Sequence, residues 1–86
     1  MYDVILMPEA ARAYQKAQVA LARRLKRCLD VLSDNPRAHP NIKRLSGHLQ
    51  GLWRYRLGVW RIVYAIDEDQ RCVKVLVIAH RREVYR

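Results

Sequence analysis

The segment at residues 52–57, Leu-Trp-Arg-Tyr-Arg-Leu, alternates apolar and basic residues. In a β-strand alternate side chains point to opposite faces, so Arg54 and Arg56 share one face while Trp53, Tyr55 and Leu57 share the other. Two cations at this spacing repel each other, and an anion held between them removes the repulsion. The pattern fits a phosphate-binding strand and, equally well, an exposed strand whose arginines are solvated.

Further basic residues follow in two segments, Val-Trp-Arg-Ile-Val-Tyr at residues 59–64 and His-Arg-Arg-Glu-Val-Tyr at residues 80–85. A cation among apolar neighbours is costly unless it faces solvent or an anion. If the strands pair through short turns, Arg61 and the end of the last strand lie beside the first two arginines, with Tyr85 close by. Arginines next to an aromatic ring and a histidine suit phosphate contact and base stacking on single-stranded RNA.

The overall charge supports a polyanionic partner. The 86 residues include 17 Lys and Arg against 8 Asp and Glu, a formal net charge of +9, with an isoelectric point near 10.3. Such an excess favours nucleic acid, an acidic membrane face or an acidic protein. Because the basic residues are dispersed among apolar ones and form no terminal block, a membrane is excluded. Nucleic acid is the first expectation and an acidic protein the second.

Targeting segments and metal motifs are not visible in the sequence. No window approaches 18 consecutive apolar residues, and residues 1–7 carry Asp3 and no basic region, which predicts a cytoplasmic protein. Cys28 and Cys72 stand alone, without a CxxC motif or clustered histidines, so we expect no metal and no cofactor. Two core thiols are the first interpretation of these cysteines, and a disulfide is the second.

The first half of the chain predicts one strand and two helices. Residues 2–7 are rich in β-formers and stop at Pro8, after which an Ala-rich run favours a helix over residues 9–16. A second helix is predicted over residues 18–32, because apolar residues recur at intervals of three and four. It ends before Pro36, which cannot continue the helical hydrogen bonds.

The second half predicts a loop and three strands. Residues 37–51 contain proline and glycines without a clear period and are interpreted as a loop. Strands are predicted at residues 52–57, 59–66 and 72–79, and their short connections require antiparallel pairing. The order β-α-α-β-β-β predicts a single α+β domain over residues 1–86, with two helices on one face of a mainly antiparallel sheet of about four strands. The other face of the sheet is expected to be open.

These features together resemble the RelE/ParE toxin superfamily. The resemblance rests on Leu-Gln-Gly-Leu-Trp-Arg-Tyr-Arg-Leu-Gly-Val-Trp-Arg-Ile-Val-Tyr at residues 49–64, the acidic turn, the Val-rich strand and the tail at residues 80–85. Pro8-Glu9-Ala10 after the first strand and the Asn35-Pro36 helix stop also fit, so nearly the whole chain is covered. The arginine strand pair is shared by RNA-cleaving RelE toxins and gyrase-poisoning ParE toxins, whereas the tail favours the RelE branch.

Membership of the RelE branch would imply a small RelE-like fold and a toxin of a type II toxin–antitoxin system. Such toxins cleave messenger RNA in the ribosomal A site, without a metal, by attack of a ribose 2′-hydroxyl on the adjacent phosphate. The implied partners are a cognate antitoxin, the ribosome and mRNA. The resemblance assigns catalytic positions to Arg54 and Arg56, where the family has basic residues and often lysines, and to Arg61, Arg81 and Tyr85.

The chemistry assigns expected roles to these side chains. The reaction needs a proton acceptor for the 2′-hydroxyl, positive charge around the phosphorane and a proton donor for the departing 5′-oxygen. Arginine keeps its proton at ordinary pH, so Arg54 is expected to clamp phosphate, and Arg61 and Arg81 to balance transition-state charge. His80 is a candidate base or RNA contact because imidazole titrates near neutral pH, although it equally fits the end of a strand. Tyr85 is expected to act or to stack.

Two other functions stay open at this point. A ParE-like protein would inhibit DNA gyrase by binding it and would need no catalytic residues of its own. A plain RNA-binding module would use the same arginines without cleavage, and the arginine at position 54, in place of a lysine, is compatible with this alternative. The loop histidines, His39 and His48, are expected to be solvated.

Overall fold

The computed structural model describes residues 1–84. Its elements follow one another as β1 (Asp3–Leu6), α1 (Pro8–Lys16), α2 (Val19–Asp34), β2 (Ile42–Arg44), the short 3-10 helix η1 (Gly47–Leu49), β3 (Trp53–Leu57), β4 (Trp60–Asp67) and β5 (Cys72–His80). Neither α-helix in this described part is both long and apolar enough to cross a membrane.

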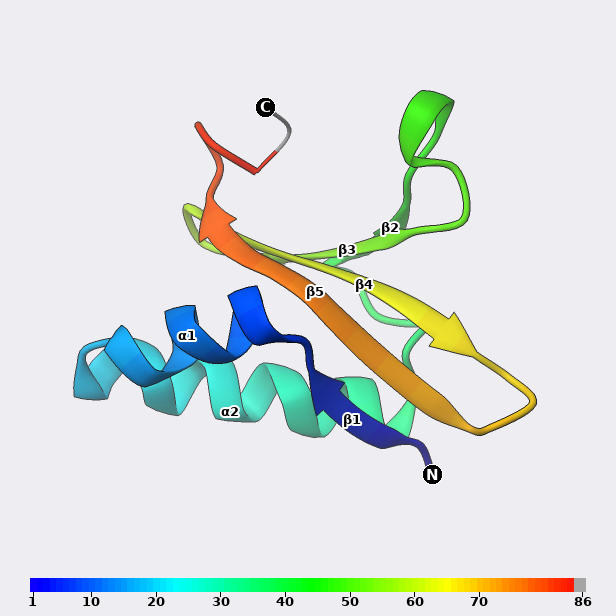
Figure 1. Ribbon diagram of the computed structural model, residues 1–86, viewed down its shortest axis with the longest axis horizontal. Helices are drawn as coiled ribbons and strands as arrows, with labels where there is room; N and C mark the ends of the chain where they lie inside the picture. The colour runs from blue at the N-terminus through cyan, green and yellow to red at the C-terminus, as the bar shows by residue number, and fades with distance from the viewer. Residues whose placement is uncertain (85–86) are drawn as a thin grey trace.

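The strands form one sheet of five in the order β1-β5-β4-β3-β2. Strand β1 runs parallel to β5, and every other neighbouring pair is antiparallel. Helices α1 and α2 lie together against one face of the sheet, while η1 and residues 81–84 rise on the other side (Figure 1). This arrangement confirms the predicted α+β class, the two helices on one face and the mainly antiparallel sheet.

The helices begin and end close to where the sequence predicts. Helix α1 begins at Pro8, whose fixed φ and missing N–H are tolerated in the first turn, and Glu9 beside it suits the helix dipole. Helix α2 ends with Asn35 as an extended C-cap, because the residue before Pro36 avoids the helical region. The helices are joined by Ala17 and Gln18 in extended conformations, which folds α1 back beside α2.

The prediction of an uninterrupted loop over residues 37–51 is wrong. Ile42, Lys43 and Arg44 pair with β3 as the edge strand β2, and the amide of Leu45 donates to the carbonyl of Leu52 at 2.9 Å. Three residues are too few to show a period of two, and the flanking proline and glycines hide the strand. The sheet therefore has five strands, one more than the sequence indicated.

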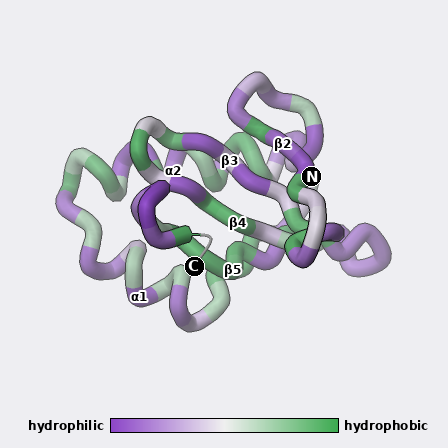
Figure 2. The backbone as a smooth tube through the Cα atoms, turned by 90° about the horizontal axis from the view of Figure 1, so that it is seen from above, coloured by the Kyte–Doolittle hydropathy of each residue, from purple (hydrophilic) through white to green (hydrophobic). Residues whose placement is uncertain are grey.

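The core lies between the helices and the inner face of the sheet. Its fully buried side chains include Leu25 and Leu32 from α2 and Ile62, Tyr64 and Val73 from the strands. Figure 2 shows the long hydrophobic stretches in β4, the central strand of the sheet, and in its neighbour β5. Tyr64 donates a buried 2.7 Å hydrogen bond to the carbonyl of Pro36, which ties β4 to the end of α2.

Both cysteines are free and buried, which confirms the interpretation as core thiols. Cys28 is 1% exposed and Cys72 is 5% exposed. Burial in this apolar setting disfavours the thiolate and raises the pKa of Cys28 to about 12.

A polar cluster lies at the end of the sheet where the chain begins. Arg37 and Arg71 each pair with Glu68 at 2.9 Å, and the hydroxyl of Tyr2 lies 2.8 and 2.9 Å from the two carboxylate oxygens. The guanidinium of Arg71 also stacks 4.3 Å above the Tyr2 ring. Hydrogen bonds from Tyr2 and Arg37 hold the pKa of Glu68 below its usual value. We call these four residues the Glu68 cluster.

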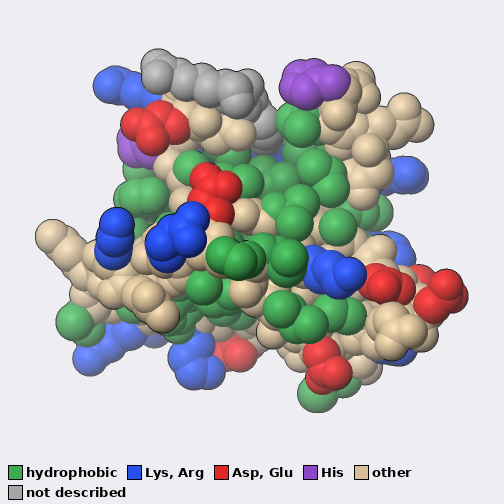
Figure 3. All heavy atoms as spheres, viewed as in Figure 1, with side chains coloured by type: hydrophobic (Ala, Val, Ile, Leu, Met, Phe, Trp, Pro, Cys, Tyr) green, Lys and Arg blue, Asp and Glu red, His purple; other side chains and the backbone are tan. Residues whose placement is uncertain are grey.

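Charged side chains are unevenly spread on the face shown in Figure 3. Lysine and arginine side chains gather along the helical side of the molecule, and hydrophobic side chains occupy the middle of this face. Among the basic residues of α2, Arg23, Arg24, Lys26 and Arg27 are all exposed.

Candidate RNA-binding cleft

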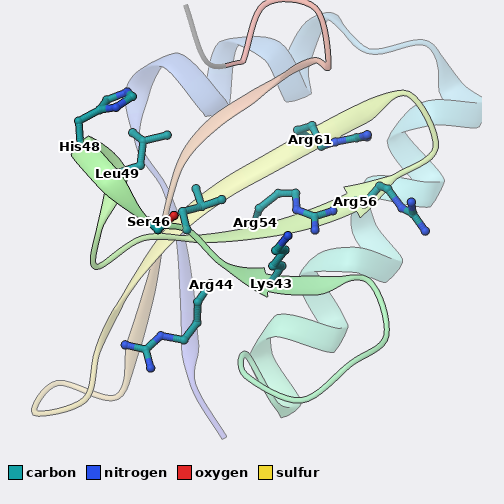
Figure 4. A pocket seen from close by; sticks show the side chains of 9 residues that line it. Lys43, Arg44, Ser46, His48, Leu49, Arg54, Arg56 and Arg61 are labelled. Carbon is teal, nitrogen blue, oxygen red and sulfur yellow. The ribbon is translucent and has the colours of Figure 1, made fainter.

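An open cleft lies over β2, β3 and the start of β4, on the face of the sheet away from the helices. Its volume is about 450 Å³, and its lining includes basic side chains from all three strands together with the segment around η1. The lining residues are Lys43, Arg44, Leu45, Ser46, His48, Leu49, Arg54, Arg56 and Arg61. Figure 4 shows that Lys43 extends toward Arg54, that Arg61 lies alongside Arg54, and that Arg44 points away from them.

Strand register explains why these cations share one face. Lys43 is the cross-strand partner of Arg54, and Arg56 is the partner of Arg61, and such partners project from the same side of a sheet. Tyr55, between the two β3 arginines, is 6% exposed and belongs to the core. The predicted alternation along residues 52–57 is thus confirmed, with the apolar side chains inward and the arginines outward.

The tight turn between β3 and β4 positions Arg61. Gly58 has a φ of +60°, which an L-residue with a side chain rarely adopts. The reversal there places Arg61 opposite Arg56, and the Arg61 guanidinium donates to the carbonyls of Gly58 at 2.7 Å and Trp60 at 2.9 Å. Arg61 is consequently held at the turn end of the cleft.

The residues that line the cleft in the described part of the chain include several cations and no Asp or Glu. Within residues 1–84, none of Lys43, Arg54 and Arg56 forms an ion pair with an acidic side chain. Guanidinium groups are planar forks that bind phosphate through paired hydrogen bonds. Because like charges held side by side destabilise a sheet, the arrangement favours a bound anion.

Proton transfer in the cleft is limited to few side chains. Arginine keeps its proton at ordinary pH, so lysine and histidine are the residue types in the lining that can serve as general acids or bases. His48 lies at the opposite end of the cleft from Arg56 and Arg61 (Figure 4). The centre of the cleft is therefore suited to charge stabilisation, with Lys43 as the proton-exchanging group nearest to Arg54 in the strand register.

The tail residues predicted as site members occupy different places. The amide of Arg81 donates to the carbonyl of Val59 at 2.8 Å, so the backbone of Arg81 lies beside the β3–β4 turn. His80 pairs in register with Trp60, and their rings meet edge-on at 6.1 Å, which places His80 on the inner side of the sheet. Tyr85 falls outside the described residues. The structure thus brings Arg54, Arg56 and Arg61 together, with Arg81 at the turn edge and His80 away from the cleft.

Sequence reasoning missed the contribution of β2 and η1. Lys43 enters the cleft because β2 pairs with β3, and His48, which is exposed as predicted, also lines the cleft through η1. Arg44 stacks 5.4 Å from the ring of Trp53 at the rim. The only sequence signal was the pair of basic residues Lys43 and Arg44 after the apolar Ile42. A run of three residues is too short to show the alternation that predicts a strand.

A metal cluster is not found in the described part of the chain. Residues 1–84 contain no group of three or more His, Cys, Asp and Glu side chains placed to hold a metal ion.

Comparison with known proteins identifies the family. Residues 4–85 match the family described as the ParE toxin of type II toxin–antitoxin system, parDE. The chain is 35% identical over 89 residues to Toxin RelE of Mycobacterium tuberculosis, which covers 99% of this chain and 87% of that protein.

Solved structures agree with this assignment. The RelE–RelB complex of Pyrococcus horikoshii contains a chain with a TM-score of 0.80 and 26% identity, covering 96% of this chain and 98% of that one. The RelBE2 complex of Mycobacterium tuberculosis contains a chain with a TM-score of 0.71 and 28% identity, and the match covers 92% of this chain and 96% of that one. The sequence match, the shared fold and the arginine strand pair together show that this chain belongs to the RelE/ParE superfamily of type II toxin–antitoxin toxins.

Proposed function

We propose that this toxin is a ribosome-dependent endoribonuclease that cleaves messenger RNA in the A site without a metal. The observation that carries the proposal is the cleft itself, where Lys43, Arg54 and Arg56 gather without a carboxylate partner in residues 1–84. A pentacoordinate phosphorane carries more negative charge than the ground-state phosphodiester. Fixed cations aimed at that charge stabilise the transition state more than the substrate.

The reaction proceeds by internal attack. The ribose 2′-oxygen bonds to the adjacent phosphorus while the bond from phosphorus to the 5′-oxygen breaks. The upstream fragment then ends in a 2′,3′-cyclic phosphate and the downstream fragment in a 5′-hydroxyl. One proton leaves the 2′-hydroxyl and one is delivered to the 5′-oxygen, so the proton count balances.

In this proposal each side chain has a role that follows from its chemistry. Arg54 and Arg56 bind the non-bridging oxygens of the phosphate, and Arg61 and Arg81 balance the charge that develops at the turn end of the cleft. The position of His80 against Trp60 favours a packing role over that of the base. Tyr85 remains a proposed catalytic or stacking residue.

The ribosome fits this proposal because the cleft is open and shallow. A substrate that is not enclosed must be positioned from outside, and a ribosome already holds mRNA in a defined geometry. Ribosome dependence also places the proposed activity in the cytoplasm. We further propose a cognate antitoxin as partner, since related toxins have been solved as RelE–RelB complexes.

Primer extension on an mRNA translated in a cell-free extract tests this function. We expect wild-type protein to produce breaks within codons only when the message is translated. Arg81→Ala should abolish the breaks, and Arg82→Ala, which removes the same charge from the next residue, should keep them. An intact message together with gyrase-linked DNA breaks would instead support the ParE-like alternative, in which the protein inhibits DNA gyrase.

A further inference from the structure

An arginine from α2 reaches the turn that closes the cleft. A Cβ atom placed on Gly58 would lie 3.0 Å from the Nη2 atom of Arg24, so the Arg24 guanidinium lies directly against the Gly58 backbone. This approach is possible because position 58 has no side chain. Helix α2 packs on the other face of the sheet. Because the Arg24 guanidinium nevertheless contacts Gly58, its side chain reaches the β3–β4 turn from the helical side.

Three arginines from three elements lie at or next to this turn. Arg61 of β4 donates to the Gly58 carbonyl at 2.7 Å, and Arg56 of β3 is its partner in the strand register. Arg24 approaches the same glycine from α2. In residues 1–84 neither Arg24 nor Arg56 forms an ion pair with a carboxylate. The turn therefore gathers charge from both sides of the sheet.

We propose that the β3–β4 turn is a second phosphate-binding site, in which Arg24 acts with Arg56 and Arg61 on the RNA backbone beyond the cleaved phosphate. The inference rests on the proposed function, because Arg56 and Arg61 also line the cleft. One continuous strand can occupy both places, since the second site begins where the cleft ends. The basic side chains continue from the cleft to this turn, and such a row matches the regularly spaced phosphates of an RNA backbone, which favours RNA over an acidic protein segment.

Two consequences distinguish a second phosphate site from a general basic surface. The contribution of Arg24 must depend on RNA length, because a short RNA fills the cleft without reaching the turn. It must also appear in the salt dependence of binding, because each neutralised phosphate of a single strand contributes about 0.7 to the slope of log K against log salt.

The experiment measures binding of 2′-O-methyl oligoadenylates, which lack the attacking hydroxyl, by fluorescence anisotropy over a range of NaCl concentrations. A trinucleotide and a dodecanucleotide are compared on full-length wild type, Arg24→Gln and Arg24→Lys. Arg12→Gln, which removes an exposed charge from α1, is the matched control. Thermal unfolding of each variant confirms that it is folded.

We expect Arg24→Gln to weaken dodecanucleotide binding about three- to fivefold at low salt. Its salt slope should fall by about 0.7. Trinucleotide binding should not change, Arg24→Lys should keep the slope, and Arg12→Gln should match wild type. An unchanged slope in Arg24→Gln, or an equal loss on both RNA lengths, would overturn the second site.

A further variant separates this inference from the proposed function. If Arg54→Gln weakens binding to both RNA lengths while Arg24→Gln changes neither, the cleft stands and the second site is rejected. If wild-type protein binds neither RNA in a salt-dependent way, the second site is rejected, whereas the proposed function is decided by primer extension on the translated message.

Discussion

Two groups of arginines in this toxin differ in whether a carboxylate neutralises their charge. In the Glu68 cluster, Arg37 and Arg71 share one carboxylate at 2.9 Å, and the Tyr2 hydroxyl completes the network. In the cleft, Arg54 and Arg56 lie beside Lys43 with no carboxylate partner among residues 1–84. The cluster connects the residue before β1, the segment after α2 and the β4–β5 turn. Lys43, Arg54 and Arg56 form no ion pair of this kind within residues 1–84. Arg37 and Arg71 therefore help to hold the fold together, and we propose that Arg54 and Arg56 instead bind a substrate.

The largest expected effect comes from removing the uncompensated pair. We expect Arg54→Gln/Arg56→Gln to slow mRNA cleavage by about a hundredfold or more, because each group stabilises charge in the transition state. The melting temperature should stay the same or rise, since two like charges are removed from one strand face. Single-turnover cleavage of a ribosome-bound message and thermal unfolding provide the two readouts.

The compensated pair provides the matched control for this variant. Arg37→Gln/Arg71→Gln removes the same charge, yet it should lower the melting temperature and leave the cleavage rate of the folded protein near that of wild type. If the two double variants lose activity equally, the division between structural and functional arginines is wrong.

A smaller effect on stability is expected from removing the buried hydrogen bond between Tyr64 and Pro36. Tyr64→Phe leaves the buried carbonyl of Pro36 without its 2.7 Å hydrogen bond. We expect the free energy of unfolding to fall by about 1–2 kcal/mol, measured by urea denaturation. Tyr14→Phe is the control, because the Tyr14 hydroxyl forms no hydrogen bond within the described residues. Equal losses in the two variants would contradict a specific role for this bond.

The Glu68 cluster also predicts a pH dependence of stability. The pKa of Glu68 is lowered in the folded state, chiefly by the Tyr2 hydroxyl and Arg37, so the folded state favours the carboxylate. The stabilisation is complete above the ordinary glutamate pKa of about 4.3 and is lost as the pH falls through the lower folded value. Melting temperatures between neutral and acidic pH should therefore converge for wild type and Glu68→Gln at low pH. Asp69→Asn, in the same turn, should keep the wild-type pH profile, and parallel curves for wild type and Glu68→Gln would contradict the assignment.

The smallest expected effect is on the chemical reactivity of the buried Cys28 thiol. With its pKa raised to about 12 and 1% exposure, Cys28 should not react with iodoacetamide in the native protein at neutral pH. Mass spectrometry after labelling should show modification only when denaturant is present. Rapid native labelling at Cys28 would mean that α2 opens more readily than its packing indicates.

Local patterns predicted much of this molecule. Both helices, the three C-terminal strands and the outward placement of Arg54 and Arg56 follow from periods of three to four and of two, which the sequence displays directly. Strand β2 was not predicted because three residues are too few to show an alternation of apolar and polar side chains. Lys43 was missed with it, since only its pairing with Arg54 brings it to the cleft.

Long-range contacts could not be predicted in the same way. Tyr2, Arg37 and Glu68 are far apart in sequence, and the acidic turn looked like an ordinary polar connection. The approach of Arg24 to Gly58 depends on how α2 lies across the sheet edge, which no local pattern encodes. His80 was placed in the site by its titration chemistry, and its inward register against Trp60 became visible only in the fold.

The claim that the cleft around Arg54 and Arg56 cuts RNA through the ribose 2′-hydroxyl is tested most directly by the chemistry of the cut ends. A programmed ribosome is loaded with mRNA that is normal or carries one 2′-deoxynucleotide at the cleaved position in the A-site codon. The account predicts a 2′,3′-cyclic phosphate on the upstream fragment of normal mRNA and no cut at the deoxynucleotide. Cleavage of the deoxy-substituted message at the same rate, or an upstream fragment with a free 3′-hydroxyl, would contradict it.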